Sequence, residues 1–163
     1  MSKIIVAATG HRPHKLGGYS FETFQKIRVL AQVWLVDIQP THVISGMALG
    51  WDQAVAQAAT NLEIPFTAAV PFASQGNNWP EYAVYFYDQL LKRAQEIVVV
   101  CNGDYQPWKM QTRNEWMVDR ADLILALWDG SPGGTANCIQ YARQQKVKVV
   151  NTFPEFQLLG GQS

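Results

Sequence analysis

The chain has 163 residues, with 13 basic and 13 acidic side chains, so it carries no net charge. Hydrophobic residues make up 48% of it, which excludes a disordered chain, and its length is that of one domain. The neutral balance gives no support to nucleic acid or a membrane as a partner. Two cysteines, Cys101 and Cys138, indicate a reducing compartment. We therefore expect a cytoplasmic protein, and the reactivity of the two cysteines stays open.

Segments typical of strands and helices alternate along the chain. The β-branched run from Ile4 to Thr9 predicts a strand that is buried on both faces. The other predicted strands are His42–Ser45, Phe66–Val70, Ile97–Val100, Leu123–Trp128 and Val147–Asn151. Helical spacing of apolar residues predicts helices over residues 20–38, Trp51–Leu62, Glu81–Ala94 and Thr135–Gln145, and a short helix that carries Arg113.

This alternation, without hairpin signals, indicates an α/β domain with a mainly parallel sheet of about six strands. We expect one domain over residues 1–155 and a loose tail from Phe156 to Ser163. Ligands of such folds bind beyond the carboxyl ends of the strands, where the strand order switches. The loops that follow the strands are therefore the candidates for a site.

The first such loop contains Gly10, His11 and Arg12. Glycine lets the backbone approach a ligand, and the planar guanidinium of Arg12 suits a phosphate, although an ordinary turn with a solvated arginine fits equally well. His11 and His14 lie three positions apart, but no cysteine or carboxylate spacing completes a set of metal ligands. We expect neither a metal nor a cofactor.

The second loop contains Ser45, Gly46, Met47 and, in the following helical turn, Asp52. Asp52 either complements the helix dipole or serves a ligand, as an acceptor for a ribose hydroxyl or as a general acid or base. The long third loop, Pro71 to Pro80, is either a binding loop or a structural anchor for Trp79.

The fourth loop contains Asp129, Gly130, Gly133, Gly134 and Thr135. Three glycines directly before a helix exceed what a simple turn needs. The backbone N–H groups that a helix start leaves unpaired are suited to an anion such as phosphate, and Arg113 could hold another part of the same ligand. The loop is neither a P-loop nor a dinucleotide fingerprint, because it lacks the lysine and the glycine spacing of these motifs.

The chain as a whole resembles the SLOG superfamily, which includes the Lonely Guy phosphoribohydrolases, DNA-processing protein A and the YpsA-like proteins. The segments ATGHRPHKLGGY and SGMALGWDQAVAQAA look most like the YpsA-like branch. Arg113, the pair Ala121-Asp122 and the turn Pro132–Thr135 are similar to a Lonely Guy pattern. The resemblance implies a three-layer Rossmann-like fold with helices on both faces of the sheet. It also implies a nucleotide pocket, with phosphate at Gly133–Thr135 and Arg113 and Ser45-Gly46 around the sugar or base.

The chain departs from that pattern at Asn137, where the Lonely Guy enzymes carry a glutamate that acts as acid and base. An amide cannot take a proton at neutral pH, and Glu115 or Asp52 would have to replace the glutamate. We therefore expect a module that binds a nucleotide-like small molecule, as in a sensor. The alternatives are a nucleotide N-glycosidase that uses Arg113 to stabilise charge, and a module that binds single-stranded nucleic acid or a protein. Nucleic acid is the partner that we expect least, and the aromatic content would also suit a homo-oligomer.

Overall fold

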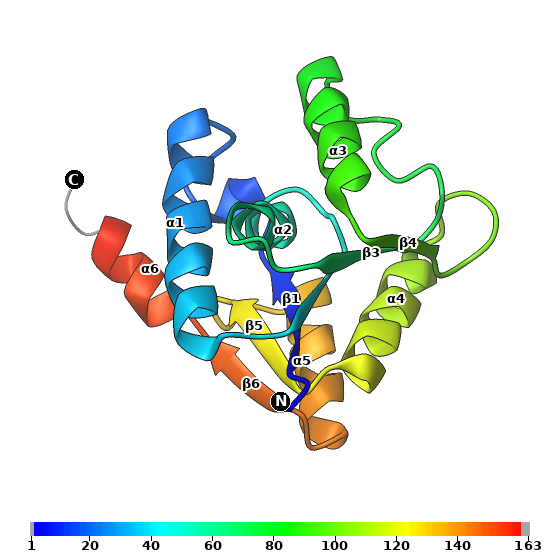
Figure 1. Ribbon diagram of the computed structural model, residues 1–163. Coiled ribbons are helices and arrows are strands. Elements are labelled where there is room, and N and C mark those ends of the chain that lie inside the picture. The colour runs from blue at the N-terminus through cyan, green and yellow to red at the C-terminus, as the bar shows by residue number, and fades with distance from the viewer. Residues whose placement is uncertain (1, 161–163) are drawn as a thin grey trace.

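A six-stranded parallel sheet forms the centre of the computed structural model, which describes residues 2–160 (Figure 1). The strands are β1 (Ile5–Gly10), β2 (His42–Ser45), β3 (Phe66–Val70), β4 (Glu96–Val99), β5 (Leu123–Leu127) and β6 (Lys148–Asn151). They lie in the order β4-β3-β2-β1-β5-β6, and every neighbouring pair is parallel. The predicted α/β class with about six parallel strands is confirmed, and the order switches between β1 and β5.

Helices cover both faces of this sheet, which makes a three-layer Rossmann-like fold (Figure 1). On one face, α1 (Phe21–Ile38), α2 (Trp51–Asn61) and α3 (Glu81–Arg93) pack over the larger apolar core. On the other face, α4 (Pro107–Arg120) and α5 (Gly134–Gln144) cover a smaller core. Side chains of β1 alternate between the two cores, since Val6 and Ala8 face the larger core and Ala7 the smaller. This alternation explains why residues 5–8 of β1 are all apolar.

A buried tryptophan fixes the start of α2 against the central strands. Trp51 is fully buried, and its indole N–H donates to the carbonyl of Leu125 in β5 at 3.0 Å. Gly10, the last residue of β1, lies directly against the Trp51 side chain, so that a Cβ atom at Gly10 would overlap the indole. The close approach places the first turn of α2 beside the carboxyl ends of β1 and β5.

Two segments differ from the prediction. The loop after β1 contains a turn of 3-10 helix, η1 (Pro13–Lys15), that begins at a proline. The predicted loose tail is wrong over residues 156–160, because a sixth helix, α6 (Phe153–Gly160), covers them. Phe153 and Phe156 of α6 pack against the larger core, and this apolar contact holds the helix in place. The rest of the predicted tail, residues 161–163, lies outside the described residues.

Across residues 2–160, none of the helices combines the length and the apolar character that a bilayer-spanning segment requires.

Candidate functional site

A pocket opens where the strand order switches, beyond the carboxyl ends of β1 and β5. Its walls come from the segment after β1, the first turn of α2, one side of α4 and the loop between β5 and α5, and its volume is about 390 Å³. Four segments that are far apart in the sequence therefore meet at the place that the fold class predicts for a ligand.

The structure brings together some of the predicted site residues and places the others elsewhere. The predicted residues that line the pocket are Gly10, His11, Arg12, Asp52, Arg113, Gly133, Gly134 and Thr135. Those outside its lining are Ser45, Gly46, Met47, Glu115, Asp129, Gly130 and Asn137. The lining also includes residues that were not among the predicted site residues, namely Thr9, His14, Lys15, Ala48, Met110, Asn114, Ser131 and Pro132. On α4, Arg113 follows Met110 by three positions and Asn114 follows it by four, so the helical spacing from Met110 was the available signal.

The glycine-rich loop presents free backbone to the pocket. Helix α5 begins at Gly134, after Gly133 with a φ of 141°, and the N–H groups of its first turn have no acceptor within the helix. Within residues 2–160, the N–H groups of Gly133, Gly134 and Thr135 donate to no protein acceptor. A Cβ atom at Gly133 or Gly134 would meet nothing within 4 Å. The loop thus leaves both open space and unused donors, which suit an anion.

Arg113 is buried and connects three elements. Its Nη1 donates to the carbonyls of Gly46 at 2.7 Å and Ala69 at 3.4 Å, and its Nε donates to Oδ1 of Asn114 at 3.1 Å. Burial lowers the pKa of its guanidinium, and the charge of Asp52 opposes that shift. Arg113 therefore joins α4 to the ends of β2 and β3 while one side of it faces the pocket. The role of Gly46 in this arrangement is to position Arg113.

The carboxyl group of Asp52 has an unusual environment. Its side chain is 5% exposed, and its Oδ1 has no hydrogen-bond partner among the described residues. Burial raises its pKa from 3.8 to about 6, although the charge of Arg113 and the N–H of Ala48 oppose the shift. Ser45 donates to the backbone carbonyl of Asp52 at 2.7 Å and accepts from the N–H of Met47 at 3.1 Å. Ser45 and Met47 thus shape the turn that holds Asp52.

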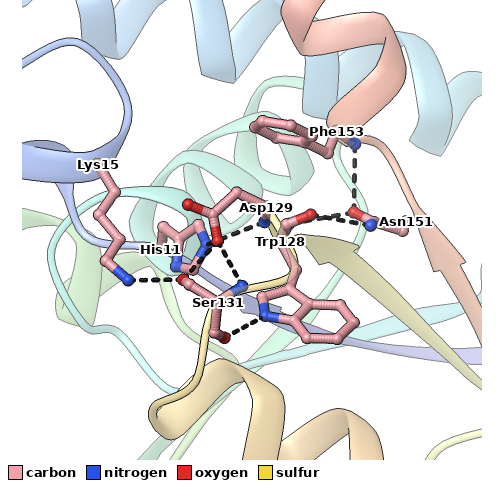
Figure 2. A network of polar contacts seen from close by, with 7 residues as sticks. All are labelled: His11, Lys15, Trp128, Asp129, Ser131, Asn151 and Phe153. Atoms are coloured by element: carbon pink, nitrogen blue, oxygen red, sulfur yellow. Dashed lines mark hydrogen bonds and ion pairs between the residues drawn. The ribbon is translucent and has the colours of Figure 1, made fainter.

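A polar network joins the two sides of the pocket mouth (Figure 2). Nε2 of His11 lies 2.8 Å from Oδ1 of Asp129, and Nζ of Lys15 donates to Oγ of Ser131 at 2.7 Å. Hydrogen bonds from the hydroxyl and the N–H of Ser131 hold the pKa of Asp129 well below its usual range. Asp129 therefore stays ionised, and it orders the loop that carries the free N–H groups.

The remaining predicted residues lie elsewhere. Glu115 accepts from the side chain of Gln111 at 3.2 Å, and Asn137 is exposed, with its N–H donating to the carbonyl of Gly133 at 3.0 Å. Burial raises the pKa of the Cys138 thiol to about 11, so this cysteine stays protonated and unreactive at neutral pH. In the third loop, Trp79 packs edge-on against Tyr87 at 5.1 Å between ring centroids, as a structural anchor would.

We expect Asp52→Asn to stabilise the protein above pH 6. The folded state holds the Asp52 proton more tightly than the unfolded state, so the stability that this group contributes below pH 3.8 is lost as the pH rises through about 6. The positive charges that face the carboxyl group are those of Arg113 and Arg12, and both oppose this loss. The asparagine side chain does not titrate, so its contribution to the free energy of unfolding does not depend on pH. The stability of Asp52→Asn relative to the wild-type protein should therefore grow with pH to on the order of 3 kcal/mol. Urea unfolding at several pH values measures it, and a constant difference between the two proteins would contradict the expectation.

The sequence matches the model of a known protein family. The model of the YspA SLOG family matches residues 6–157. An uncharacterised SPbeta prophage-derived protein, YoqJ, of Bacillus subtilis is 36% identical over 62% of this chain and 68% of its own length. The expected resemblance to the YpsA-like branch is confirmed.

Several solved structures share the fold, including two that cover at least 90% of this chain. One is DNA processing protein A from Helicobacter pylori, described for its single-stranded DNA binding mode, with a TM-score of 0.64 and 18% identity over 90% of this chain. This chain spans 63% of that protein. The other is the molybdenum cofactor binding protein from Rippkaea orientalis, with a TM-score of 0.61 and 17% identity over 98% of this chain and 83% of that one.

The low expectation for nucleic acid has no support from these structures. It was based on the neutral net charge, but the fold occurs in a protein that is described as binding single-stranded DNA. Net charge reports on the whole surface, whereas a strand of nucleic acid would meet the local charges of one pocket. Here Arg12, Lys15 and Arg113 lie together in such a pocket.

Proposed function

The chain belongs to the YspA SLOG family, and from its pocket we propose that it binds a nucleotide or nucleotide-derived small molecule through a phosphate group. The observation that carries this proposal is the row of unused N–H groups at Gly133, Gly134 and Thr135, at the start of α5. Such donors bind a phosphate oxygen without any movement of side chains, and the helix dipole adds to the attraction.

The charges around the pocket support an anionic ligand. Its lining contains the guanidinium groups of Arg12 and Arg113 and the ammonium group of Lys15, against the single carboxyl group of Asp52. Arginine and lysine bind phosphate well, through a planar pair of donors and a compact charge respectively. A ligand with one or more phosphate groups matches this balance, and reversible binding of such a ligand is what a sensor requires.

Calorimetry with AMP, ADP-ribose and adenosine tests this proposal. We expect the two phosphorylated compounds to bind and adenosine to bind at least about tenfold more weakly, because charge-assisted hydrogen bonds are lost. Lys15→Ala should weaken AMP binding several-fold and reduce its dependence on salt. Lys92→Ala, at an exposed position on α3, is the matched control and should leave binding unchanged. Equal binding of adenosine and AMP would contradict a phosphate site.

One observation favours a second candidate, N-glycosidic hydrolysis. Asp52 is the carboxyl group of the pocket, and its pKa of about 6 lies near the range of an effective general acid. Asn137 stands where the Lonely Guy enzymes carry a glutamate, and Glu115 does not line the pocket, so Asp52 would have to act alone. Chromatography of AMP after incubation with the protein detects free adenine. Release that Asp52→Asn abolishes would support an enzyme, and no release would leave binding as the function.

A single strand of nucleic acid is the third ligand class to be tested. Binding of a single-stranded oligonucleotide in the same calorimetric series, at low and moderate salt, compares it with AMP on equal terms. Affinity for the oligonucleotide that greatly exceeds affinity for AMP, with a steep decrease in salt, would replace the small molecule with a strand as the ligand.

A further inference from the structure

Asp52 keeps a hydrogen-bond acceptor in the pocket wall that the protein does not use. Its side chain is buried and its Oδ1 accepts from no group among residues 2–160, although a buried polar atom without a partner is costly. The backbone around it is fixed by the hydrogen bond from Ser45 to the Asp52 carbonyl. The acceptor is therefore held in one place beside the pocket, and no described residue supplies its hydrogen-bond donor.

The nearest positive charges do not fill this role. Arg113 and Arg12 both act on the Asp52 carboxyl group through their charge. No ion pair within 4.0 Å joins either of them to Asp52 in the described part of the chain. The Nη1 and Nε donors of Arg113 go instead to carbonyl and amide oxygens. The two guanidinium groups attract Asp52 and at the same time disfavour a cation beside it, so the missing donor is a neutral group.

The position of Asp52 complements that of the free N–H groups. Asp52 belongs to the α2 wall of the pocket, while Gly133, Gly134 and Thr135 belong to the β5–α5 wall. A phosphate against the N–H groups is attracted, whereas a phosphate against Asp52 would be repelled. A ligand that satisfies both walls therefore carries its anionic group at one end and a neutral hydrogen-bond donor at the other. A pocket of about 390 Å³ has room for both.

We propose that Asp52 accepts a hydrogen bond from a sugar hydroxyl of the ligand, so that the pocket selects ribosyl phosphates over their deoxyribosyl counterparts. This inference rests on the proposed phosphate site. A hydroxyl is neutral and donates readily to a carboxylate, and the vicinal hydroxyls of ribose present two donors side by side. A deoxy sugar would leave the Asp52 oxygen buried without a partner, and its binding would bear that cost.

The test is calorimetry with AMP, 2′-deoxy-AMP, 3′-deoxy-AMP and 2′,3′-dideoxy-AMP. We expect AMP to bind roughly ten- to hundredfold more tightly than the dideoxy compound, the range of a hydrogen bond to a charged group. In Asp52→Ala this ratio should decrease to near one, mainly because AMP binds less well. Asp37→Asn, at an exposed position of α1, is the matched control and should keep the full ratio.

The outcomes separate this inference from the proposed function. If AMP and its dideoxy form bind the wild-type protein equally well, the phosphate site stands and the role of Asp52 is overturned. If the ratio of AMP to dideoxy-AMP affinity is large but persists in Asp52→Ala, another group binds the sugar hydroxyls, which also overturns the inference. If none of the four compounds binds, the proposed function itself fails. The comparison in the wild-type protein needs no variant, so a folding defect in Asp52→Ala cannot hide the result.

Discussion

Replacing Arg113 with alanine is expected to lower the free energy of unfolding by about 3 kcal/mol or more. The guanidinium is buried and donates to the carbonyls of Gly46 and Ala69 and to the side chain of Asn114. Alanine would leave these acceptors with fewer partners. It would also remove the positive charge that has the largest effect on the pKa of Asp52. Because that charge opposes the raised pKa of Asp52, the pKa of this carboxyl group should rise further above about 6.

Urea unfolding at neutral pH measures this effect, with Arg120→Ala as the matched control. Arg120 lies on the same helix but is exposed, with its guanidinium carbon 3.9 Å from the centre of the Trp116 ring. Its removal should cost about 1 kcal/mol or less. Equal losses in the two variants would mean that the buried contacts of Arg113 contribute no more than a surface arginine does.

Gly134→Ala is expected to abolish most phosphate binding while the protein stays folded. The glycine is the first residue of α5, and its added Cβ would meet no protein atom within 4 Å. Alanine is also the better helix former, so stability should stay the same or rise by up to about 1 kcal/mol. The methyl group would occupy the space beside the free N–H groups, and AMP should bind at least about tenfold more weakly.

Calorimetry and thermal unfolding of the same sample separate the two effects of this substitution. Gln140→Ala, at an exposed position farther along α5, should change neither binding nor stability by much. An affinity for AMP that is unchanged in Gly134→Ala would show that the ligand does not reach the start of α5. A large loss of stability would show that the site is more tightly packed than the open space around Gly134 indicates.

The fold could be predicted because the amino-acid composition of each strand indicates whether its faces are buried. Residues 5–8 of the first strand are all apolar because both faces of the strand are covered, and such a run is typical of a parallel sheet between two helical layers. The helix over residues 156–160 was not predicted because the glycine-containing tail suggested a loose segment. Phe153 and Phe156 hold α6 against the core through contacts that the local sequence does not reveal.

The sequence indicated the position of the pocket mainly through features of the backbone. The glycine-rich β5–α5 loop drew attention to backbone N–H groups, and of its glycines Gly133 and Gly134 line the pocket whereas Gly130 does not. Side chains were harder to place, because a residue one position away on a loop can face the opposite direction. Gly46 was expected at the ligand but serves Arg113, while Lys15 was overlooked although its turn brings it to Ser131 across the pocket mouth (Figure 2).

The most direct test of the account is a titration of ¹⁵N-labelled protein with AMP, followed by the backbone amide signals in NMR spectra. We propose that the N–H groups of Gly133, Gly134 and Thr135, which donate to no backbone acceptor among residues 2–160, bind the phosphate. We predict that these three signals shift and reach saturation together, while the signals of α6, which contributes no residue to the pocket lining, stay in place. Saturable binding of AMP without any shift at these three amides, or no saturation up to millimolar AMP, would contradict the claim.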